Sequence, residues 1–248
     1  MKSLEKRFQR NPEFYQKYST TINDYINKGH AIKLSNAQTN IEAPNINYLP
    51  HHGVTNINKP GKMRVVFDAG AKFQKTCLND NILKGPDLLN NLFSVLLKFR
   101  EGKYAVISDV EQMFHQVLVN CYDQQSLRFL WRENTTQPFN DYAMRVHLFG
   151  KADSPCCANW ALKRTALDHS DSFHPDVIQA VTEKFYMDDY LDSFNDLSKA
   201  KVTVKSIIQL LRKGGFHLKK WMSNSIDILN DLPSTHISLK VVNLDLAQ

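Results

Sequence analysis

The sequence is poor in cysteine and has no long apolar run. Its four cysteines show no CxxC spacing, and adjacent Cys156 and Cys157 are poorly placed to pair with each other. A zinc ribbon and a disulfide scaffold are therefore not indicated, and we expect reduced thiols in an intracellular, cytoplasmic protein. No segment approaches the roughly 18 apolar residues of a membrane span. The charged stretch MKSLEKRFQR lacks the apolar core of a signal peptide, so we expect no membrane association.

Internal repeats and low-complexity tracts are also lacking, whereas the composition is that of a globular protein. Of the 248 residues, 42% are hydrophobic and 23% are charged, enough for a sizeable core. The formal net charge is +6. This mild basic excess is compatible with a polyanionic partner such as nucleic acid, but it does not require one.

Apolar residues recur at helical and at strand periods along the chain. Helical spacing and end signals predict helices over residues 12–28, 86–101, 154–168 and 198–212. Short β-prone runs predict strands at 65–67, 104–108, 127–133, 142–150, 183–187, 190–194 and 216–222. The largely apolar run at 104–108 predicts a strand buried on both faces, and 30–60 are expected to be loops. The order predicts a mixed α+β fold.

Two adjacent carboxylates stand out in FYMDDYLDS, residues 185–193. Asp188 and Asp189 repel each other, and their apolar neighbours strengthen the repulsion by lowering the local dielectric. An isolated Asp-Asp pair is more often a solvated turn, and an EF-hand is excluded because its spacing and central Gly are absent. Asp109 ends another predicted strand, so three carboxylates converge if the two strands are neighbours. Hard oxygen ligands select Mg²⁺ or Mn²⁺, and two such ions about 4 Å apart can clamp a phosphoryl displacement.

Basic residues accompany these carboxylates. Lys62 and Arg64 stand at the start of a predicted strand, where a guanidinium fork could bind a triphosphate. A solvated cationic edge strand explains them about equally well. Lys219 and Lys220 could act similarly from another strand, or they could simply be exposed.

Several ordered motifs resemble those of a reverse transcriptase, specifically that of the Bel/Pao class of LTR retrotransposons. YMDD at 186–189 resembles the YxDD box, and ISDVEQMFHQV at 107–117 resembles the strand with the first catalytic aspartate. HLFGKADSP at 147–155 resembles the box-B loop, and KMRVVFDA at 62–69 resembles the fingers hairpin. LPHHGV at 49–54 and GGFHLKKWMSN at 214–224 are particularly similar to Bel/Pao sequences. A lone YMDD is weak, but this ordered set is specific.

This resemblance implies an α+β fold of the right-hand polymerase type. It would contain fingers and palm, with an antiparallel palm sheet backed by helices and a largely missing thumb. We expect an N-terminal helical extension over 1–44, the reverse transcriptase fingers and palm over 45–225, and the truncated start of a following region over 226–248. No RNase H, protease or integrase motif is seen, so we expect a fragment of a pol polyprotein or a decayed copy.

The resemblance also implies which residues carry the chemistry. Asp109, Asp188 and Asp189 would be catalytic, and together with the backbone carbonyl of Val110 they would hold two Mg²⁺ or Mn²⁺ ions. Asp109 and Asp188 would be the principal ligands and Asp189 a weaker one. Asp192 falls outside the matched box, so we expect a structural or solvated role for it.

Further positions are implied on the nucleotide side. Arg64, assisted by Lys62, would contact the γ-phosphate side. The backbone amides of Gln112 and Met113 would meet the triphosphate. Phe114 matches the steric gate that excludes a ribose 2′-hydroxyl, although by itself it could equally be a core phenylalanine.

The remaining implied contacts surround the base and the primer. Phe149 and Gly150 match the loop beneath the incoming base, where retroviral enzymes commonly carry Gln in place of Phe149. Tyr186 and Met187 would lie near the primer end. The lysine that assists pyrophosphate departure would be Lys220 or its neighbour Lys219, and the sequence does not choose between them.

The implied activity is that of an RNA-directed DNA polymerase, a nucleotidyltransferase. A primer 3′-hydroxyl would attack the α-phosphate of a deoxynucleoside triphosphate on an RNA or DNA template. The expected partners are this primer–template and the remaining pol polyprotein, with its RNase H and integrase. An intact element would place the protein in a virus-like particle. The alternatives are a polymerase-like remnant that binds nucleic acid without catalysis, and a non-functional product of a decayed element.

Overall fold

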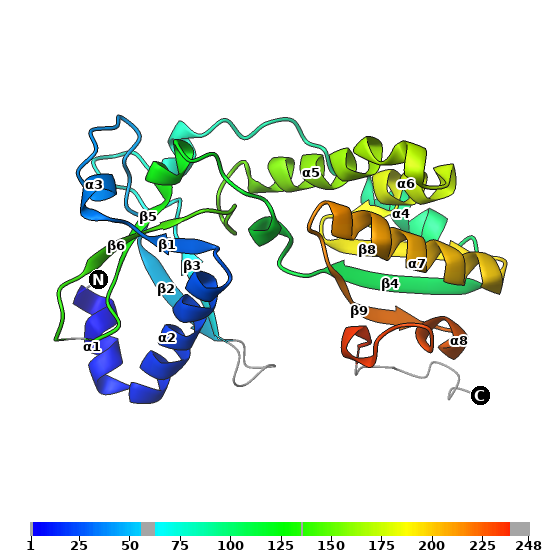
Figure 1. Cartoon of the computed structure of the whole chain (residues 1–248), viewed down its shortest axis with the longest axis horizontal. Coiled ribbons are helices and arrows are strands. Elements are labelled where there is room, and N and C mark those ends of the chain that lie inside the picture. The colour runs from blue at the N-terminus through cyan, green and yellow to red at the C-terminus, as the bar shows by residue number, and fades with distance from the viewer. Residues whose placement is uncertain (1, 56–62, 135, 239–248) are drawn as a thin grey trace. The chain divides into compact units, whose positions relative to one another are not determined.

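The structure is a computed structural model that describes residues 2–55, 63–134 and 136–238, and its chain divides into two compact units (Figure 1). Unit 1 comprises Met1–Lys84 and Val117–Ser154, and unit 2 comprises Gly85–Gln116 and Pro155–Gln248. Each unit therefore joins two segments that are separated in the sequence. Among the described residues, no helix is long and apolar enough to cross a membrane.

Unit 1 contains two small antiparallel sheets in its described part. One has the strand order β1-β6-β5 and the other pairs β2 with β3. The strands are β1 (Ala31–Lys33), β2 (His51–Thr55), β3 (Met63–Phe67), β5 (Arg128–Trp131) and β6 (Asn140–Met144). The helices are α1 (Lys2–Arg10), α2 (Pro12–Asn27), α3 (Asn36–Thr39) and the 3₁₀ helices η1 (Leu78–Asn81) and η3 (Asp123–Leu127).

The predicted helix at 12–28 is confirmed as α2. Asn11 caps it by accepting a hydrogen bond of 2.9 Å from the backbone N–H of Phe14, and Pro12 opens its first turn. Its inward stripe packs on an aromatic core, in which the rings of Tyr18 and Trp131 stack with centroids 5.6 Å apart. The prediction of loops over 30–60 is wrong for the short helix α3 and for strands β1 and β2. These short strands form because partners distant in the sequence complete their hydrogen-bond ladders.

Unit 2 is built on a four-stranded antiparallel sheet with the order β7-β8-β4-β9. The strands are β4 (Tyr104–Val110), β7 (Phe185–Tyr186), β8 (Asp189–Phe194) and β9 (Leu218–Ser223). The helices are α4 (Leu92–Phe99), α5 (Ser154–Asp168), α6 (Pro175–Glu183), α7 (Leu197–Lys213), α8 (Ile226–Leu229) and the 3₁₀ helices η2 (Met113–Gln116), η4 (Ser170–Ser172) and η5 (Ser234–His236). Helices α4 and α7 both contact β8, and Figure 1 shows α7 running along the sheet.

The helices predicted at 154–168 and 198–212 are confirmed as α5 and α7. The helix predicted from residue 86 begins only at Leu92, because Asn91 provides its N-cap. The carboxylate of Asp87 forms a local turn instead, by accepting a hydrogen bond from the N–H of Leu89. The leucines whose helical spacing predicted this helix do not form its buried face. Leu92 and Leu96 are exposed, and Val95 is the buried residue of α4.

Strand β4 lies between β8 and β9 and places the candidate site at one of its ends. We expected both faces of this strand to be buried, but its residues alternate. Val106, Ser108 and Val110 are buried, whereas Ile107 and Asp109 are only partly covered. Alternation is the pattern of a sheet with one face in the core, so the opposite face can display Asp109.

Candidate active site

Asp109 and Asp189 face each other across neighbouring strands of unit 2. In the antiparallel β4–β8 pair their Cα atoms are direct partners in register. In the β7–β8 hairpin, Asp189 also pairs with Tyr186. The expected meeting of the two carboxylate-bearing segments therefore occurs in the fold, at the edge where β4 ends and β8 begins.

Asp188 lies in the two-residue turn between β7 and β8. Met187, the first residue of this turn, has φ 54°, a region where glycine is usual and another side chain costs roughly 1–3 kcal/mol. The turn aims the carbonyl of Asp188 at β4, where it accepts a hydrogen bond of 2.8 Å from the backbone N–H of Val110. The hairpin tip is thus tied to the strand that carries Asp109.

A β-bulge in β9 separates the two candidate lysines. Lys219 is the register partner of Asp109, and Met222 is the partner of Ile107, so β9 has one extra residue between them. The extra residue is accommodated at Lys220, whose backbone adopts φ 58°. As a result its Nζ lies 2.5 Å from Oδ2 of Asp109.

Lys219 makes a different contact. Its Nζ lies 2.6 Å from a carboxylate oxygen of Glu111. Among the two lysines that the sequence left equivalent, Lys220 is therefore the one that reaches a candidate catalytic carboxylate.

The neighbouring carboxylates disfavour ionisation of Asp189. The pKa of Asp189 is raised, first by partial burial and then by the negative charges of Asp188 and Asp109. The ammonium of Lys220 opposes this by lowering the pKa of Asp189. Excess negative charge at one sheet edge is the condition under which a cation is favourable.

The donor chemistry fits a hard divalent cation such as Mg²⁺ or Mn²⁺, because all three side chains offer carboxylate oxygens. The carboxylates do not form a closed cage. Within the described part of unit 2, no three His, Cys, Asp or Glu side chains bring their ligand atoms within 4.8 Å of one another. Asp109 is instead paired with Lys220.

The segment after β4 contains the predicted triphosphate and sugar contacts. Gln112 has φ 50°, and the 3₁₀ helix η2 begins at the next residue. Met113 and Phe114 are buried, with relative exposures of 3% and 8%. Gln112, Met187 and Lys220 are all non-glycine residues with positive φ that flank the carboxylates, a clustering that is typical of functional sites.

Three other predicted residues belong to unit 1. Arg64 is exposed on β3 opposite Val54. Phe149 is 53% exposed, and Gly150 adopts φ 88°, a conformation that favours glycine. Lys62 lies outside the described residues.

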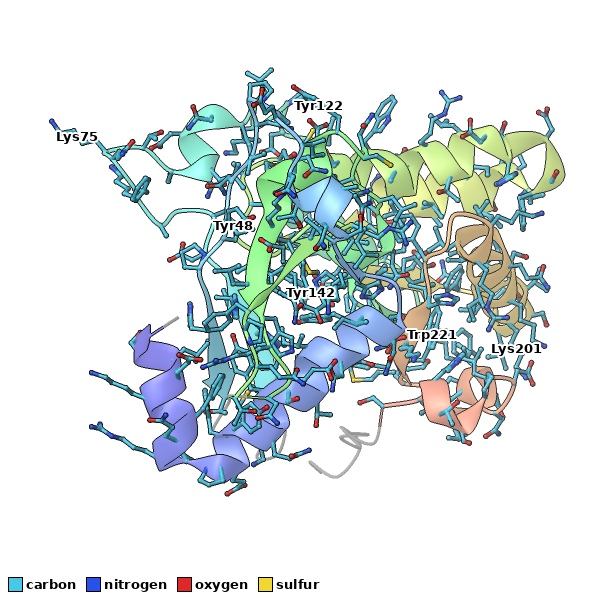
Figure 2. All side chains as sticks on the ribbon, turned by 60° about the vertical axis from the view of Figure 1, so that its left-hand side comes forward. Tyr48, Lys75, Tyr122, Tyr142, Lys201 and Trp221 are labelled. Carbon is cyan, nitrogen blue, oxygen red and sulfur yellow. The ribbon has the colours of Figure 1, made fainter. Side chains whose placement is uncertain are left out.

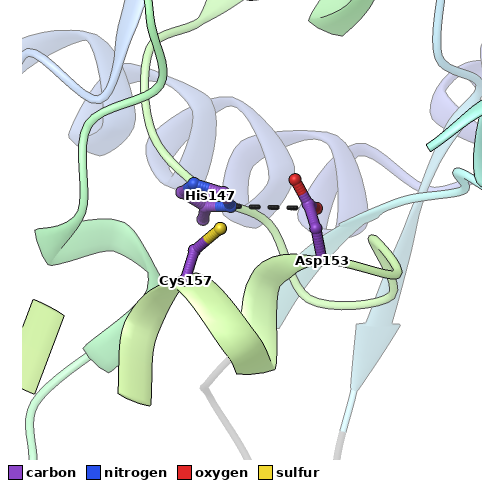
Figure 3. Close-up of side chains that lie close together, drawn as sticks. All are labelled: His147, Asp153 and Cys157. Atoms are coloured by element: carbon purple, nitrogen blue, oxygen red, sulfur yellow. Dashed lines mark ion pairs between the residues drawn. The ribbon is translucent and has the colours of Figure 1, made fainter. Parts of the chain in front are cut away.

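Two buried polar clusters were not recognised as clusters from the sequence, although a structural role was one of the two expected for Asp192. In unit 1, Nδ1 of His147 lies 3.9 Å from Oδ1 of Asp153, and Lys151 pairs with Asp153 at 2.5 Å. Figure 3 marks the pair of His147 and Asp153 with a dashed line. In unit 2, Asp192 is buried and paired with Lys184 at 3.1 Å. The only sequence signal for the second cluster was a carboxylate at an inward position of a strand.

This chain resembles known proteins in its three-dimensional structure. No known family model matches the sequence, and no curated protein matches it. A foamy viral protease-reverse transcriptase (dRH) in complex with double-stranded DNA matches with a TM-score of 0.59 and 18% identity, covering 84% of this chain and 31% of that chain. A prototype foamy virus protease-reverse transcriptase (CSH mutant) matches with a TM-score of 0.59 and 17% identity, covering 84% of this chain and 24% of that chain. The chain therefore has a mixed α/β fold with antiparallel sheets that is similar to a retroviral reverse transcriptase, and it spans less than a third of these proteins.

Proposed function

We propose that this chain is the RNA-directed DNA polymerase domain of a Bel/Pao-class retrotransposon. The observation that carries the proposal is the direct pairing of Asp109 with Asp189, beside a turn that binds Asp188 to Val110. The fold similarity supports the same class of protein. In this proposal 1–44 are the N-terminal extension and 45–225 the fingers and palm, with the palm in unit 2, and 226–248 are the start of a following region.

The carboxylates of Asp109, Asp188 and Asp189, with the carbonyl of Val110, would hold two divalent cations. Bound there, these cations would neutralise charge on the attacking and leaving oxygens of phosphoryl transfer. The chain's own contribution is to position the reactants and supply fixed charge. Lys220, beside Asp109, would present its ammonium to the departing pyrophosphate, because it points to the carboxylates while Lys219 does not.

Other roles rest on the sequence resemblance. The amides of Gln112 and Met113 would bind the triphosphate, Phe114 would exclude a 2′-hydroxyl, and Tyr186 and Met187 would contact the primer end. In unit 1 the γ-phosphate would be bound by Arg64 and Lys62, and the base would rest on Phe149 and Gly150. Template contacts would be mainly to the backbone and therefore salt-dependent. The native setting would be a cytoplasmic virus-like particle containing the RNase H and integrase of the same polyprotein.

Primer extension tests this proposal. The chain, alone and with its downstream segment, is incubated with an RNA template, a DNA primer, deoxynucleoside triphosphates, and Mg²⁺ or Mn²⁺. We expect extension by the wild type and none by Asp188→Asn. Asp171→Asn is the matched control, because Asp171 is exposed on η4 and is not part of the four-stranded sheet. No extension by any wild-type form overturns the proposal.

Binding measurements then separate the other two functions. A remnant that binds without catalysis would show salt-sensitive affinity for primer–template that Asp188→Asn does not weaken. A non-functional product of a decayed element would show neither binding nor synthesis.

A further inference from the structure

Asp192 is a charged residue on the inner face of β8. The strand alternates between covered and open positions, and Asp192 lies between buried Tyr190 and Phe194, where an apolar side chain is expected. It is only 5% exposed. A carboxylate buried in this way costs several kcal/mol unless it is paired and hydrogen-bonded.

Both oxygens of this carboxylate have partners. Oδ1 lies 3.1 Å from Nζ of Lys184 and accepts from the backbone N–H of Ser193 at 2.8 Å. Oδ2 accepts a hydrogen bond of 2.9 Å from the hydroxyl of Tyr190. Lys184 is itself largely covered, with 17% of its side chain exposed. The cluster is therefore a complete buried polar network rather than an isolated charge.

The network joins the two arms of the β7–β8 hairpin. Lys184 precedes β7, and its carbonyl accepts a hydrogen bond of 3.0 Å from the N–H of Leu191 in β8. The ion pair with Asp192 adds a side-chain link between the same two arms. The turn between these arms carries Asp188, and β8 begins with Asp189.

Tyr190 extends the network beneath the carboxylates. It follows Asp189 directly and pairs in register with Ser108, the neighbour of Asp109. Its ring packs edge-on against Trp221 of β9, which is labelled in Figure 2, with centroids 6.0 Å apart. Trp221 is the residue after Lys220, so the network supports β8 and β9 from the buried face of the sheet.

We propose that Lys184, Asp192 and Tyr190 form a positioning network that fixes the register of the β7–β8 hairpin and thereby sets the cation-binding geometry of Asp109 and Asp189. The proposal rests on the proposed function, because it assumes that these carboxylates bind divalent cations. A slip of one residue would turn Asp192 outward, leave Lys184 unpaired and move Asp189 away from its partner. None of the three side chains is required to touch a substrate or a cation.

Manganese binding to the full chain, followed by electron paramagnetic resonance, tests this network without any need for turnover. We expect Asp192→Asn to weaken Mn²⁺ binding by about 10- to 100-fold, the usual effect of losing a group that orients metal ligands. The control is Asp176→Asn, which breaks the exposed pair of Asp176 with Lys199 at 2.7 Å and should leave the affinity unchanged. Wild-type affinity in Asp192→Asn would overturn the inference.

A double variant separates positioning from simple stabilisation. Lys184→Met combined with Asp192→Leu replaces a buried ion pair by apolar groups, which is often neutral or stabilising. We expect its melting temperature to recover only in part, because the buried hydroxyl of Tyr190 has lost its acceptor, and we expect Mn²⁺ binding to stay weak. Recovery of both properties would show a purely structural role and reject the inference. This variant also decides the question if Asp192→Asn does not fold.

The failure of this inference is distinguishable from the failure of the proposed function. A wild type that binds Mn²⁺ but does not extend a primer rejects the polymerase proposal. The Mn²⁺ affinities of the variants still test the positioning network in that case. A wild type that extends primers, together with an Asp192→Asn variant of equal Mn²⁺ affinity, rejects the network alone. A wild type that binds no Mn²⁺ rejects the network as well.

Discussion

Nζ of Lys220 lies 2.5 Å from Oδ2 of Asp109, whereas the adjacent Lys219 pairs with Glu111. Two neighbouring lysines on a regular strand point to opposite faces, and the bulge decides which face each one occupies. The pairing of Lys220 with Asp109 has two consequences. It partly neutralises the carboxylate edge, and it places a proton donor beside the position where we propose that pyrophosphate leaves.

Replacement of Lys220 by Ala should lower the single-turnover extension rate by at least about tenfold, the lower range expected for loss of a general acid. The ammonium of Lys220 lowers the pKa of Asp189, so its removal should raise that pKa further. The acidic limb of the pH–rate profile should therefore move to higher pH. Rates measured between pH 5 and 9 provide the check.

Lys219→Ala is the matched control for this change. The substitution breaks the ion pair of Lys219 with Glu111, which is partly exposed and contributes at most about 1 kcal/mol to stability. The extension rate should therefore change little. Equal losses in the two variants would contradict the assignment of Lys220.

The conformation of Lys220 gives a separate prediction for stability. Ala and Gly at this position remove the same amine, but the φ of 58° is unfavourable for any residue with a Cβ atom. Lys220→Gly should therefore be more stable than Lys220→Ala by about 1 kcal/mol. Urea denaturation of the two variants measures the difference, and a more stable Ala variant would be inconsistent with the bulge.

Stability should fall as the solution becomes acidic because two histidines are buried in neutral form. Burial lowers the pKa of His51 to about 4, and burial together with Lys151 lowers the pKa of His147 to about 4. Both values lie below the ordinary value of about 6.5, so the unfolded chain takes up protons first as the pH falls. The stabilisation is present above about pH 6.5 and is lost toward pH 4, by on the order of 1–2 kcal/mol for each group at pH 5.

Denaturation curves between pH 5 and 7 test this dependence. Nε2–H of His51 donates a hydrogen bond to the carbonyl of Leu130, so Nδ1 of the neutral ring accepts one from the hydroxyl of Tyr18. His52 is exposed on the same strand. His51→Gln should flatten the dependence of unfolding free energy on pH, and His52→Gln should leave it unchanged. A slope that is equal in wild type and His51→Gln would contradict the assignment.

Local signals were sufficient for many of the elements. Capping by Asn11 and Pro12 located α2, and glycine after Lys213 located the end of α7. The position of Asp109 at a strand end and of Asp188 in a hairpin turn followed from apolar runs that stop at a charge. These features depend on residues that are close together in the sequence, which is why a single sequence is enough to predict them.

Long-range pairing was the part that the sequence did not reveal. Strand β1 has only three residues, and its partners in β6 lie more than 100 residues away. The buried pair of Lys184 and Asp192, and the bulge at Lys220, likewise depend on which strands become neighbours. Charged residues are ordinarily assigned to the surface, so their composition alone gives no sign of a buried network.

Phe114 provides the prediction that bears most directly on substrate choice. It is buried in η2, five residues after Asp109, and we propose that its ring lies against the sugar of the incoming nucleotide. Phe114→Val replaces the ring by a smaller isopropyl group and should raise ribonucleotide incorporation relative to deoxynucleotide incorporation by roughly 10- to 100-fold, the range for a pocket that selects by shape. Extension with each nucleotide type gives the ratio.

The melting temperature must be measured alongside, because loss of a buried ring is destabilising. Phe129→Leu is the control, since Phe129 is buried in unit 1, and unchanged sugar discrimination in Phe114→Val would show that Phe114 is only a core residue.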